Sequence, residues 1–417
     1  MQSPADQQPL AGIRVLDYSQ FVAGPLAAMI LADLGAEVIK VEAPRGDAYR
    51  EYEPLGNGQS RRFMALNRGK RSLCLDLTTE SDRSTSRALI RTADVVVHNM
   101  PRERAERFGL SRESIAALNP NAVVTSISAF GNEGPLAAHT GYDLIAQSYS
   151  GLLFADPRPG QTVPQRCGSI PLADITTGLM TVISVLTGLV DRPRRATAAH
   201  LSVSLLSSAL LTQIQDLVRL DSDPPPPPAT AELLHERGEA KRRADDLEPY
   251  YGCYETADGF IAVACLNIAQ RERMGAVLAI SDPWLRDPQA PAASATEYRQ
   301  RWETKKSVAE RLRSERSRHW VQVFRQANVP CMEVRTLESA FGDTQVEDNH
   351  LTQKIHQPGV GEVELLGSLL TIDGEPLPQT SRPAPGLGEH NHEILTALST
   401  PHASSGENRE SHAALPR

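Results

Sequence analysis

Residues 13–42 read IRVLDYSQFVAGPLAAMILADLGAEVIKVE and predict the architecture of the first half of the chain. Residues 13–18 and 37–42 are apolar runs typical of buried strands, and residues 25–34 have the apolar spacing of a helix. Gly35 follows the helical segment, where the left-handed conformation that ends many helices favours glycine. A strand, a helix and a strand in this order make a βαβ unit, so we expect two parallel neighbouring strands.

The alternation of strand-like and helix-like segments continues beyond this unit. Ser111 precedes one of the helix-like segments and has the side chain of an N-cap residue. Because alternating strands and helices cover both faces of a parallel sheet, the pattern predicts a doubly wound α/β domain. The strand-like segments are 71–77, 95–98 and 123–129, and the helix-like segments are 81–92 and 111–118.

A run of five prolines at 224–228 interrupts the pattern, because neither a helix interior nor a strand interior accepts such a run. The charged segment that follows has few large apolar residues, so we interpret residues 223–247 as a connector. Residues 250–264, YYGCYETADGFIAVA, predict a hairpin with its turn at 257–259. A second, smaller unit therefore follows the connector.

The composition argues against several classes of protein. A net charge of −8 argues against nucleic acid as the main partner. The longest apolar run, residues 179–190, is shorter than the about 18 residues that a membrane-spanning helix needs. The first residues, MQSPADQQPLAG, do not have the pattern of a signal peptide. No CxxC pair and no metal-ligand spacing of histidines is present, so we expect reduced thiols, a cytoplasmic location and no bound metal.

A single acid stands among small residues in CGSIPLADITTG, residues 167–178. Asp174 precedes a long apolar helical pattern, where an aspartate most often serves as an N-cap. The alternative is a carboxylate nucleophile, which is ionised at neutral pH from a reference pKa of about 3.9 and needs an electrophile with a good leaving group. A thioester is such an electrophile, and the small neighbours would leave space for its acyl group. Both interpretations are open at this point, because a helix N-terminus stabilises a carboxylate in either case.

A dinucleotide site is not expected in the βαβ unit. Glu42 ends its second strand, as the ribose-binding acid does in dinucleotide-binding folds. The loop at residues 19–25, however, holds one glycine where the G-x-G-x-x-G fingerprint has three. Asp17, at the end of the first strand, is interpreted as a turn acid.

Several segments agree with one known family when they are read in order. They include GYDLIAQSYSGL (141–152), IPLADITTGL (170–179) and LGEHNHEIL (387–395), each of which is a weak signal by itself. Taken together, the segments resemble the family III CoA-transferases, the group that includes formyl-CoA transferase and carnitine CoA-transferase. The other matching segments are 9–47, 66–77, 93–110 and 254–259, so that the resemblance extends from residue 9 to residue 396.

The resemblance implies a fold in which a large Rossmann-like domain is built from both chain ends, here residues 1–222 and 329–400. A smaller α+β domain, residues 248–328, is inserted after a linker at 223–247. Two chains of the family interlock as linked rings, so a homodimer is expected. Residues 401–417 are expected to form a disordered tail.

The resemblance also implies a mechanism. The family nucleophile falls on Asp174, which attacks the thioester of an acyl-CoA to form a mixed anhydride, and CoA then passes through an aspartyl thioester to a small carboxylic acid. No metal and no permanently bound cofactor is needed, and acyl-CoA is a substrate. Tyr142 and Asp143 fall at the acyl pocket, although a core tyrosine and a helix-capping aspartate fit the sequence equally well. The CoA-binding positions fall on Val22, Ala23, Leu75, Asn99, Met100 and Arg107, and of these the arginine suits a phosphate group.

The α-methylacyl-CoA racemases share this fold and are the alternative. Their catalytic histidine falls on Tyr142, their aspartate on Asp174 and their glutamate on Glu255. Since a tyrosine with a reference pKa of about 10 is a poor base at neutral pH, the sequence favours a transferase.

Two departures bear on the substrate. The glycine-rich loop that covers the active site of formyl-CoA transferase has no counterpart in the sequence. Residues 136–140, LAAHT, offer no basic side chain for a second carboxylate. Either the acceptor is a monocarboxylate, or another segment recognises its second charge.

Overall fold

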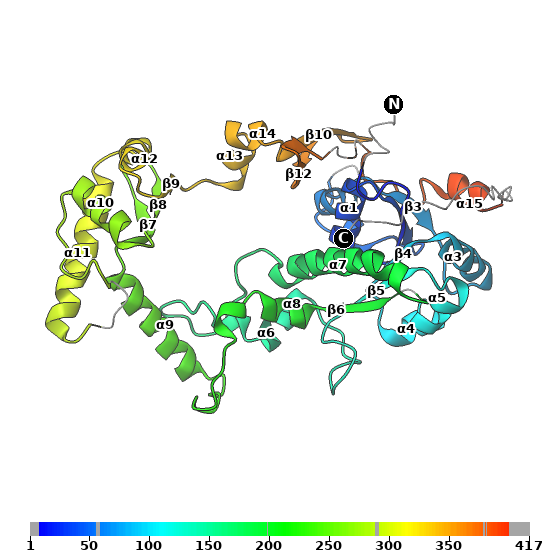
Figure 1. Cartoon of the computed structure of the whole chain (residues 1–417), viewed down its shortest axis with the longest axis horizontal. Coiled ribbons are helices and arrows are strands. Elements are labelled where there is room, and N and C mark those ends of the chain that lie inside the picture. The colour runs from blue at the N-terminus through cyan, green and yellow to red at the C-terminus, as the bar shows by residue number, and fades with distance from the viewer. Residues whose placement is uncertain are drawn as a thin grey trace. The chain divides into compact units, whose positions relative to one another are not determined.

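Six parallel strands form the central sheet of the computed structural model, which describes residues 8–55, 59–197, 199–287, 292–377, 380 and 382–399 (Figure 1). The strand order is β3-β2-β1-β4-β5-β6, and each neighbouring pair is parallel. The order reverses between β1 and β4, as it does in doubly wound folds. The predicted α/β class with a parallel sheet is therefore confirmed. The strands are β1 (Arg14–Asp17), β2 (Glu37–Glu42), β3 (Arg71–Cys74), β4 (Val95–His98), β5 (Val123–Ser128) and β6 (His200–Ser204).

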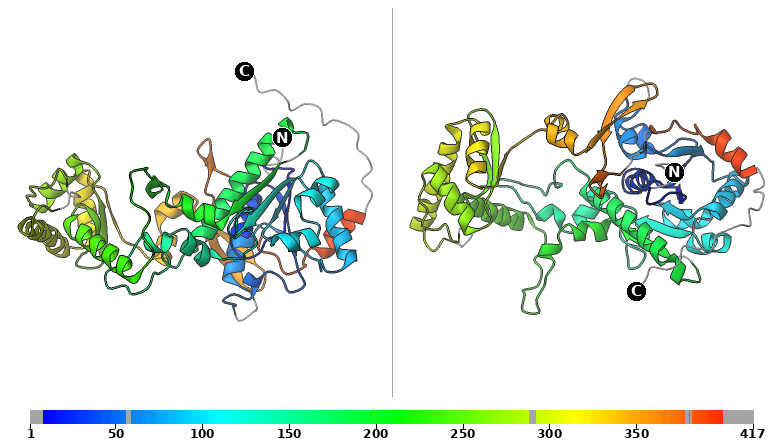
Figure 2. Two further views of the ribbon diagram at one scale, coloured as in Figure 1. Left: turned by 90° about the horizontal axis from the view of Figure 1, so that it is seen from below. Right: turned by 45° about the horizontal axis from the view of Figure 1, so that its top comes forward.

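Helices α1 (Ala23–Asp33) and α7 (Leu172–Asp191) cover one face of this sheet (Figures 1 and 2). Val15, Val95 and Val97 point from the strands into the apolar core that these helices complete. The two helices cross closely, because a Cβ atom on Gly178 would lie 3.0 Å from the Ala23 carbonyl oxygen. The crossing therefore holds the second turn of α7 against the first turn of α1.

Helices α3 (Glu80–Thr92), α4 (Arg102–Arg107) and α5 (Arg112–Leu118) cover the opposite face, and their apolar residues pack on Leu16, Val96 and Val124. Ser111 accepts a hydrogen bond from the Ser114 N–H, so the predicted N-cap is confirmed. Successive side chains of β4 point to opposite faces of the sheet, and both faces are covered by helices. This explains why β4 is apolar at every position except the last.

The edge of the sheet at β3 is covered by the segment that returns at the end of the described chain. The Ser72 N–H donates to Nδ1 of His390, and the His390 N–H donates to the Ser72 carbonyl. The Cys74 N–H donates to the side chain of Asn391. This segment pairs backbone groups that an open edge strand would leave exposed. Helix α15 (Asn391–Ser399) follows it directly.

The described residues divide into two compact units. The first contains residues of 1–150, 170–217 and 348–417, and the second contains residues of 151–169 and 218–347. The second unit holds an antiparallel sheet of β7 (Tyr251–Glu255), β8 (Phe260–Ala264) and β9 (Cys331–Glu333), packed with α10 (Ile268–Leu278), α11 (Ala295–Arg313) and α12 (Ser317–Gln326) around Trp320 and Phe324.

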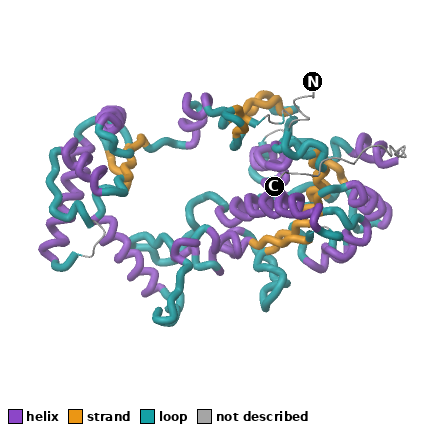
Figure 3. Tube along the Cα trace, in the orientation of Figure 1, coloured by secondary structure: helices purple, strands orange, loops and turns teal. Residues whose placement is uncertain are grey.

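The remaining elements are short, apart from one helix (Figure 3). Helix α9 (Ala231–Leu247) occupies most of the segment that the sequence suggested as a connector. The other helices are α2 (Arg61–Asn67), α6 (Asp143–Tyr149), α8 (Leu205–Leu211), α13 (Leu337–Phe341) and α14 (Thr344–Asp348), and the other strands are β10 (Thr352–Gln357), β11 (Gly361–Leu366), β12 (Thr371–Ile372) and β13 (Glu375–Pro376).

Several predicted boundaries differ from the observed ones. β4 and the hairpin of β7 and β8 lie where the sequence predicted them, whereas α1 begins two residues early and β3 ends at Cys74. The predicted boundaries of the large domain, residues 1–222 with 329–400, and of the small domain, residues 248–328, remain predictions. The predicted tail, residues 401–417, lies outside the described residues.

Helix α7 is more apolar than the sequence run suggested. Among the described residues, the helical segment 172–194 is the one that is long and apolar enough to cross a membrane by length and composition alone. One side of it packs against α1, β5 and β6, as the core helix of a globular domain does. Its opposite side carries the exposed residues Leu179, Ile183 and Val190.

Replacing Gly178 by alanine should weaken the crossing of α1 and α7. The new methyl group would lie 2.8 Å from Cδ2 of Leu26 and 3.0 Å from a backbone oxygen, so one of the helices must shift. We expect the free energy of unfolding in urea to fall by about 1–3 kcal/mol. The control Gly252→Ala places its methyl group in open space and should change the value by less than about 0.5 kcal/mol. Equal stability of Gly178→Ala and the wild type would contradict the close packing.

Candidate active site

The loops after β1 and β4 meet at the point where the strand order of the sheet reverses. The Gln20 N–H donates to Oδ1 of Asn99 at 3.1 Å, and Nδ2 of Asn99 donates to the Gln20 carbonyl at 2.8 Å. This amide therefore joins the two loops by a pair of hydrogen bonds. Crevices at such reversal points, beyond the carboxyl ends of the strands, are where open parallel sheets bind ligands.

Most of the predicted CoA-binding residues lie at this edge of the sheet. Val22 and Ala23 begin α1, Leu75 directly follows β3, and Asn99 and Met100 directly follow β4. The side chains of Val22, Ala23 and Leu75 are buried, so they could meet a ligand mainly through their backbone.

The sixth predicted CoA-binding residue, Arg107, lies apart from these loops at the end of α4. Its guanidinium group is exposed and lies 4.8 Å from the centre of the Phe108 ring. The ring holds one face of the cation, while its N–H groups stay accessible to a phosphate.

Asp174 lies inside the first turn of α7, so its interpretation as the N-cap of that helix is wrong. The N-cap position belongs to Pro171, which has no side chain that can accept a hydrogen bond. The acceptor comes from a distant residue instead: Oδ1 of Asp143 receives the N–H groups of Ala173 at 2.8 Å and Asp174 at 3.3 Å. Asp143 therefore caps α7 from the start of α6, and its other oxygen accepts from Nε2 of Gln147 at 2.6 Å.

The carboxyl group of Asp174 has an unusual proton affinity. Burial raises its pKa, and the nearby carboxylate of Asp143 raises it further, to about 7. The sequence-based expectation of full ionisation at neutral pH is therefore wrong. A carboxylate with a raised pKa is more basic and more nucleophilic than an ordinary aspartate, and such values are typical of functional sites.

Three aromatic rings from different loops gather next to this helix end. The ring of Phe21 makes edge-to-face contacts with Tyr142 at 5.3 Å and Tyr49 at 6.0 Å between centroids. Burial and then the charge of Asp174 raise the pKa of Tyr49, which indicates that the phenol lies near this carboxylate. Tyr142 is 63% exposed, so the alternative of a core tyrosine is wrong. Phe21 and Tyr49 were missed, although Phe21 lies in a segment that matched the family (9–47) and Tyr49 lies two residues beyond it.

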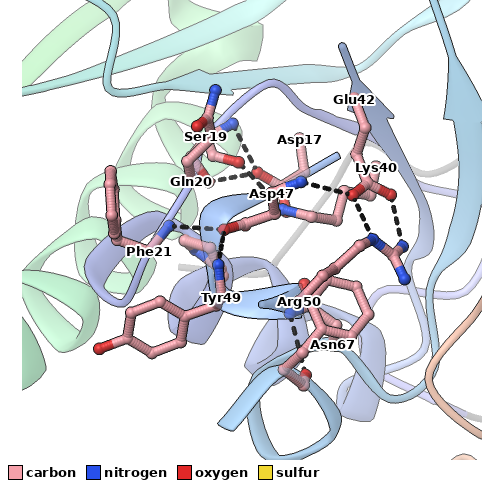
Figure 4. A network of polar contacts seen from close by, with 12 residues as sticks. Asp17, Ser19, Gln20, Phe21, Lys40, Glu42, Asp47, Tyr49, Arg50 and Asn67 are labelled. Carbon is pink, nitrogen blue, oxygen red and sulfur yellow. Dashed lines mark hydrogen bonds and ion pairs between the residues drawn. The ribbon is translucent and has the colours of Figure 1, made fainter. Parts of the chain in front are cut away.

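A buried cluster of charges lies beneath the loop after β1 (Figure 4). Asp17 is not a simple turn acid, because its Oδ2 lies 2.9 Å from Nζ of Lys70 and 3.9 Å from Nζ of Lys40. Burial would raise the pKa of Asp17, but the two lysines and the Ser19 hydroxyl outweigh it and lower the pKa to about 2. Burial lowers the pKa of Lys70 to about 8.

Other candidate groups lie elsewhere. Glu42 accepts hydrogen bonds from Arg50 and Ser72, which explains its position at the end of β2 without a ribose. Glu255 belongs to the second unit, where it pairs with Arg313 at 2.7 Å. Within the described ranges, no group of three His, Cys, Asp or Glu side chains is arranged to hold a metal ion.

Comparison with known proteins gives one consistent family. The family model described as CoA-transferase family III matches residues 10–391. The chain is 32% identical to the succinate–glutarate CoA-transferase of Agrobacterium fabrum, with 95% of this chain and 97% of the relative covered. It is 30% identical to the succinyl-CoA:glutarate CoA-transferase of Mus musculus, with 94% and 87% covered. The crystal structure of a CAIB/BAIF family protein from Brucella suis superposes with a TM-score of 0.74 at 28% identity, over 94% of this chain and 99% of that one.

Replacing Asp174 by asparagine should stabilise the protein in a pH-dependent way. The folded state raises the pKa of this carboxyl from 3.8 to about 7, so the folded protein holds a proton that the unfolded chain releases between these values. The stability of the wild type should therefore fall as the pH rises from 4 to 7. We expect Asp174→Asn to gain roughly 1–3 kcal/mol over the wild type at pH 8, a value reduced for partial exposure, and little at pH 4.

Urea unfolding at several pH values between 4 and 8 measures this difference. The control Asp76→Asn removes an exposed carboxylate whose pKa is lowered by hydrogen bonds from Thr78, so it should show no gain as the pH rises. A constant difference between Asp174→Asn and the wild type across the pH range would show that the carboxyl titrates normally.

Proposed function

The chain belongs to CoA-transferase family III, and from this premise we propose that it transfers CoA from an acyl-CoA thioester to a free carboxylic acid through a covalent intermediate on Asp174. The observation that carries the proposal is the environment of this carboxyl group. It is held in the first turn of a core helix next to Asp143, with a pKa of about 7. The carboxylate is thereby fixed in place and more nucleophilic than a solvated one.

The first half of the reaction loads CoA on the enzyme. An oxygen of the Asp174 carboxylate attacks the thioester carbon, the C–S bond breaks, and CoA leaves as a thiolate. The product is a mixed anhydride of Asp174 and the donor acid. The thiolate then attacks the aspartyl carbonyl carbon, and the donor acid leaves as a carboxylate. The result is an aspartyl-CoA thioester.

The second half reverses these steps with the acceptor acid. The acceptor carboxylate attacks the aspartyl carbonyl carbon, and the CoA thiolate leaves again. Attack of the thiolate on the acceptor carbonyl forms the new acyl-CoA and restores the carboxylate of Asp174. Each bond that forms replaces one that breaks, so no oxidant or reductant is consumed. Because anhydrides hydrolyse, water must be kept from the site during both stages.

The CoA moiety is proposed to occupy the carboxyl edge of the sheet. Val22, Ala23 and Leu75 offer backbone groups there, and Asn99 and Met100 line the neighbouring loop. Arg107 is proposed to bind a phosphate, because its cation is exposed on one face and supported by Phe108 on the other.

Tyr142 is proposed to line the acyl pocket, with Asp143 beneath it as the group that holds the end of α7. The aromatic ring of Tyr142 is exposed, whereas both oxygens of Asp143 already accept hydrogen bonds. The relatives with glutarate in their names make succinyl-CoA and glutarate the first pair to try. The comparisons do not favour the racemase alternative, because these relatives are CoA-transferases and a tyrosine stands at the position of the racemase histidine.

The active form is proposed to be a homodimer, in the interlocked arrangement of the family, in the cytoplasm. The five cysteines are odd in number and include no CxxC pair, which favours reduced thiols in such a compartment. Helices α6, α7 and α8 contact one another, and each exposes large apolar side chains, which we call together the outer apolar face. A second copy of the chain would bury this face, whose exposed members are Leu144, Ile145, Leu179, Ile183, Val190 and Leu211.

Replacing Asp174 by alanine should abolish transfer while the fold and the affinity for CoA are kept. We expect a loss of at least about 1,000-fold in kcat, because the covalent route has no other nucleophile. Chromatography of CoA esters measures transfer from succinyl-CoA to glutarate and from acetyl-CoA to a panel of monocarboxylates. Asp76, a half-buried residue whose carboxylate accepts hydrogen bonds from Thr78, supplies the control, and Asp76→Ala should transfer CoA at the wild-type rate.

Mass spectrometry of wild-type enzyme quenched during turnover tests the intermediate itself. Hydroxylamine should convert the aspartyl-CoA thioester or the mixed anhydride to a hydroxamate on residue 174. An adduct on a different residue, or appreciable transfer by Asp174→Ala, would exclude the proposed mechanism.

Sedimentation should show the wild-type protein at twice the mass of one chain. Ile183→Lys places a charge on the outer apolar face and should shift the protein toward single chains or prevent its assembly. The control Leu366→Lys alters an exposed apolar residue of β11, away from this face, and should leave the dimer intact. A wild-type protein with the mass of one chain would contradict the dimer.

A further inference from the structure

The loop between β1 and α1 is held from below by buried charged side chains (Figure 4). Nζ of Lys40 donates to the Ser19 carbonyl at 3.0 Å, and Oδ1 of Asp17 accepts the Ser19 N–H at 2.9 Å. Nζ of Lys70 reaches the Pro25 carbonyl at 2.9 Å, one turn into the helix. Both ends of the loop are therefore fixed by groups that water does not reach.

The middle of the loop depends on a different residue, Asp47. Its Oδ1 accepts the Phe21 N–H at 3.2 Å and the Tyr49 N–H at 3.0 Å, and its Oδ2 lies 2.9 Å from Nζ of Lys40. The backbone N–H of Asp47 donates to Oε1 of Glu42 at 3.0 Å, which fixes the carboxylate in turn. Only 1% of Asp47 is exposed.

Phe21 needs this support because its backbone is strained. Its φ of +69° lies in the left-handed region, which side chains with a Cβ atom adopt at an energetic cost. The conformation directs the Phe21 ring to Tyr142 and Tyr49, the two other members of the aromatic cluster. Tyr142 adjoins Asp143, whose carboxylate holds the N–H group of Asp174.

We propose that Asp47 is a positioning residue for the transfer reaction: it holds Phe21 in its left-handed conformation and Tyr49 in its turn, and so sets the aromatic rings that flank Asp174. Asp47 does not touch the reacting atoms itself and acts through the backbone of these two residues. This role rests on the proposed function, and it would restrict where the acyl group can lie relative to the nucleophile.

The charges around Asp47 explain why an acid can serve there. Burial would lower the pKa of Lys40, but Asp17 and Asp47 raise it, so the ammonium group stays charged. The surrounding cluster holds three carboxylates and three cations and is neutral as a whole. Its members are Asp17, Glu42, Asp47, Lys40, Arg50 and Lys70.

Two substitutions separate the acceptor function of Asp47 from its charge. Asp47→Asn keeps an oxygen for the N–H groups of Phe21 and Tyr49 and should retain kcat within about threefold of the wild type. Asp47→Ala removes the acceptor and should lower kcat about tenfold or more. Asp33→Ala is the matched control, because Asp33 is a half-buried partner of Arg68 at the other end of α1, and this variant should keep the wild-type kcat despite lower stability.

A second background tests whether Asp47 acts through Phe21. In Phe21→Gly the backbone needs no support, because glycine adopts a positive φ freely, and the ring is absent. Asp47→Ala should therefore cost less than about threefold in kcat in this background. Hydrogen exchange of residues 19–23 gives a readout without substrate, and exchange should accelerate in Asp47→Ala and not in Asp47→Asn.

Several results would contradict the positioning role of Asp47. Unchanged kcat and exchange in Asp47→Ala, an equal loss of kcat in Asp33→Ala, or the same loss with and without Phe21 would overturn the positioning role alone. Failure of the proposed function would be seen differently, as an absence of transfer by the wild-type enzyme, and would overturn the positioning role together with it.

Discussion

The ion pairs of Asp17 with Lys70 and Lys40 are the interaction on which the carboxyl edge of the sheet depends. All three side chains are fully buried, and an unpaired charge in that position would be strongly destabilising. The pairs join β1, β2 and the segment before β3, so the three strands must keep their register for the charges to meet. Once they meet, Lys40 also donates to the Ser19 carbonyl between β1 and α1, and Lys70 also donates to the Pro25 carbonyl at the start of α1.

Two aspartates near the same edge show how strongly the surroundings decide the chemistry of a carboxyl group. Asp17 lies between two cations and keeps a pKa of about 2 despite its burial. Asp174 is buried next to a second carboxylate, and its pKa is raised to about 7. The first residue is thereby fixed as a structural anion, whereas the second can gain or lose a proton near neutral pH. Different surroundings can thus give two aspartates in one protein different pKa values, and with them different roles.

The sequence was sufficient for features that depend on neighbouring residues. The strand β4 and the Ser111 cap follow from an apolar run and from one hydroxyl group, and both were predicted correctly. The cap of α7 could not be predicted in this way, because its acceptor, Asp143, lies about 30 residues before the N–H groups that it receives. The pairing of Asp17 with Lys70 is invisible for the same reason, since it spans 53 residues.

The sequence analysis missed helix α9 for a different reason. Its 17 residues are strongly charged and bury few apolar side chains, so the pattern that identifies a core helix is absent. The site could also be predicted only in part. The motifs indicated Asp174, but the direction of the Phe21 ring depends on a left-handed backbone conformation that residue propensities do not predict.

Helix α7 has three functions, which a shorter helix could not fulfil together. Its inner side completes the core with α1, its outer side is apolar and exposed, and its first turn carries Asp174, the proposed nucleophile. Burying a carboxyl group with a raised pKa costs stability, so the helix must be anchored elsewhere. The 20-residue length provides this anchor, because the residues beyond Asp174 contribute most of the packing and hold its turn rigidly. Asp143 is then free to act at the helix end, where a single carboxylate can both cap the exposed N–H groups and raise the pKa of the residue that carries one of them.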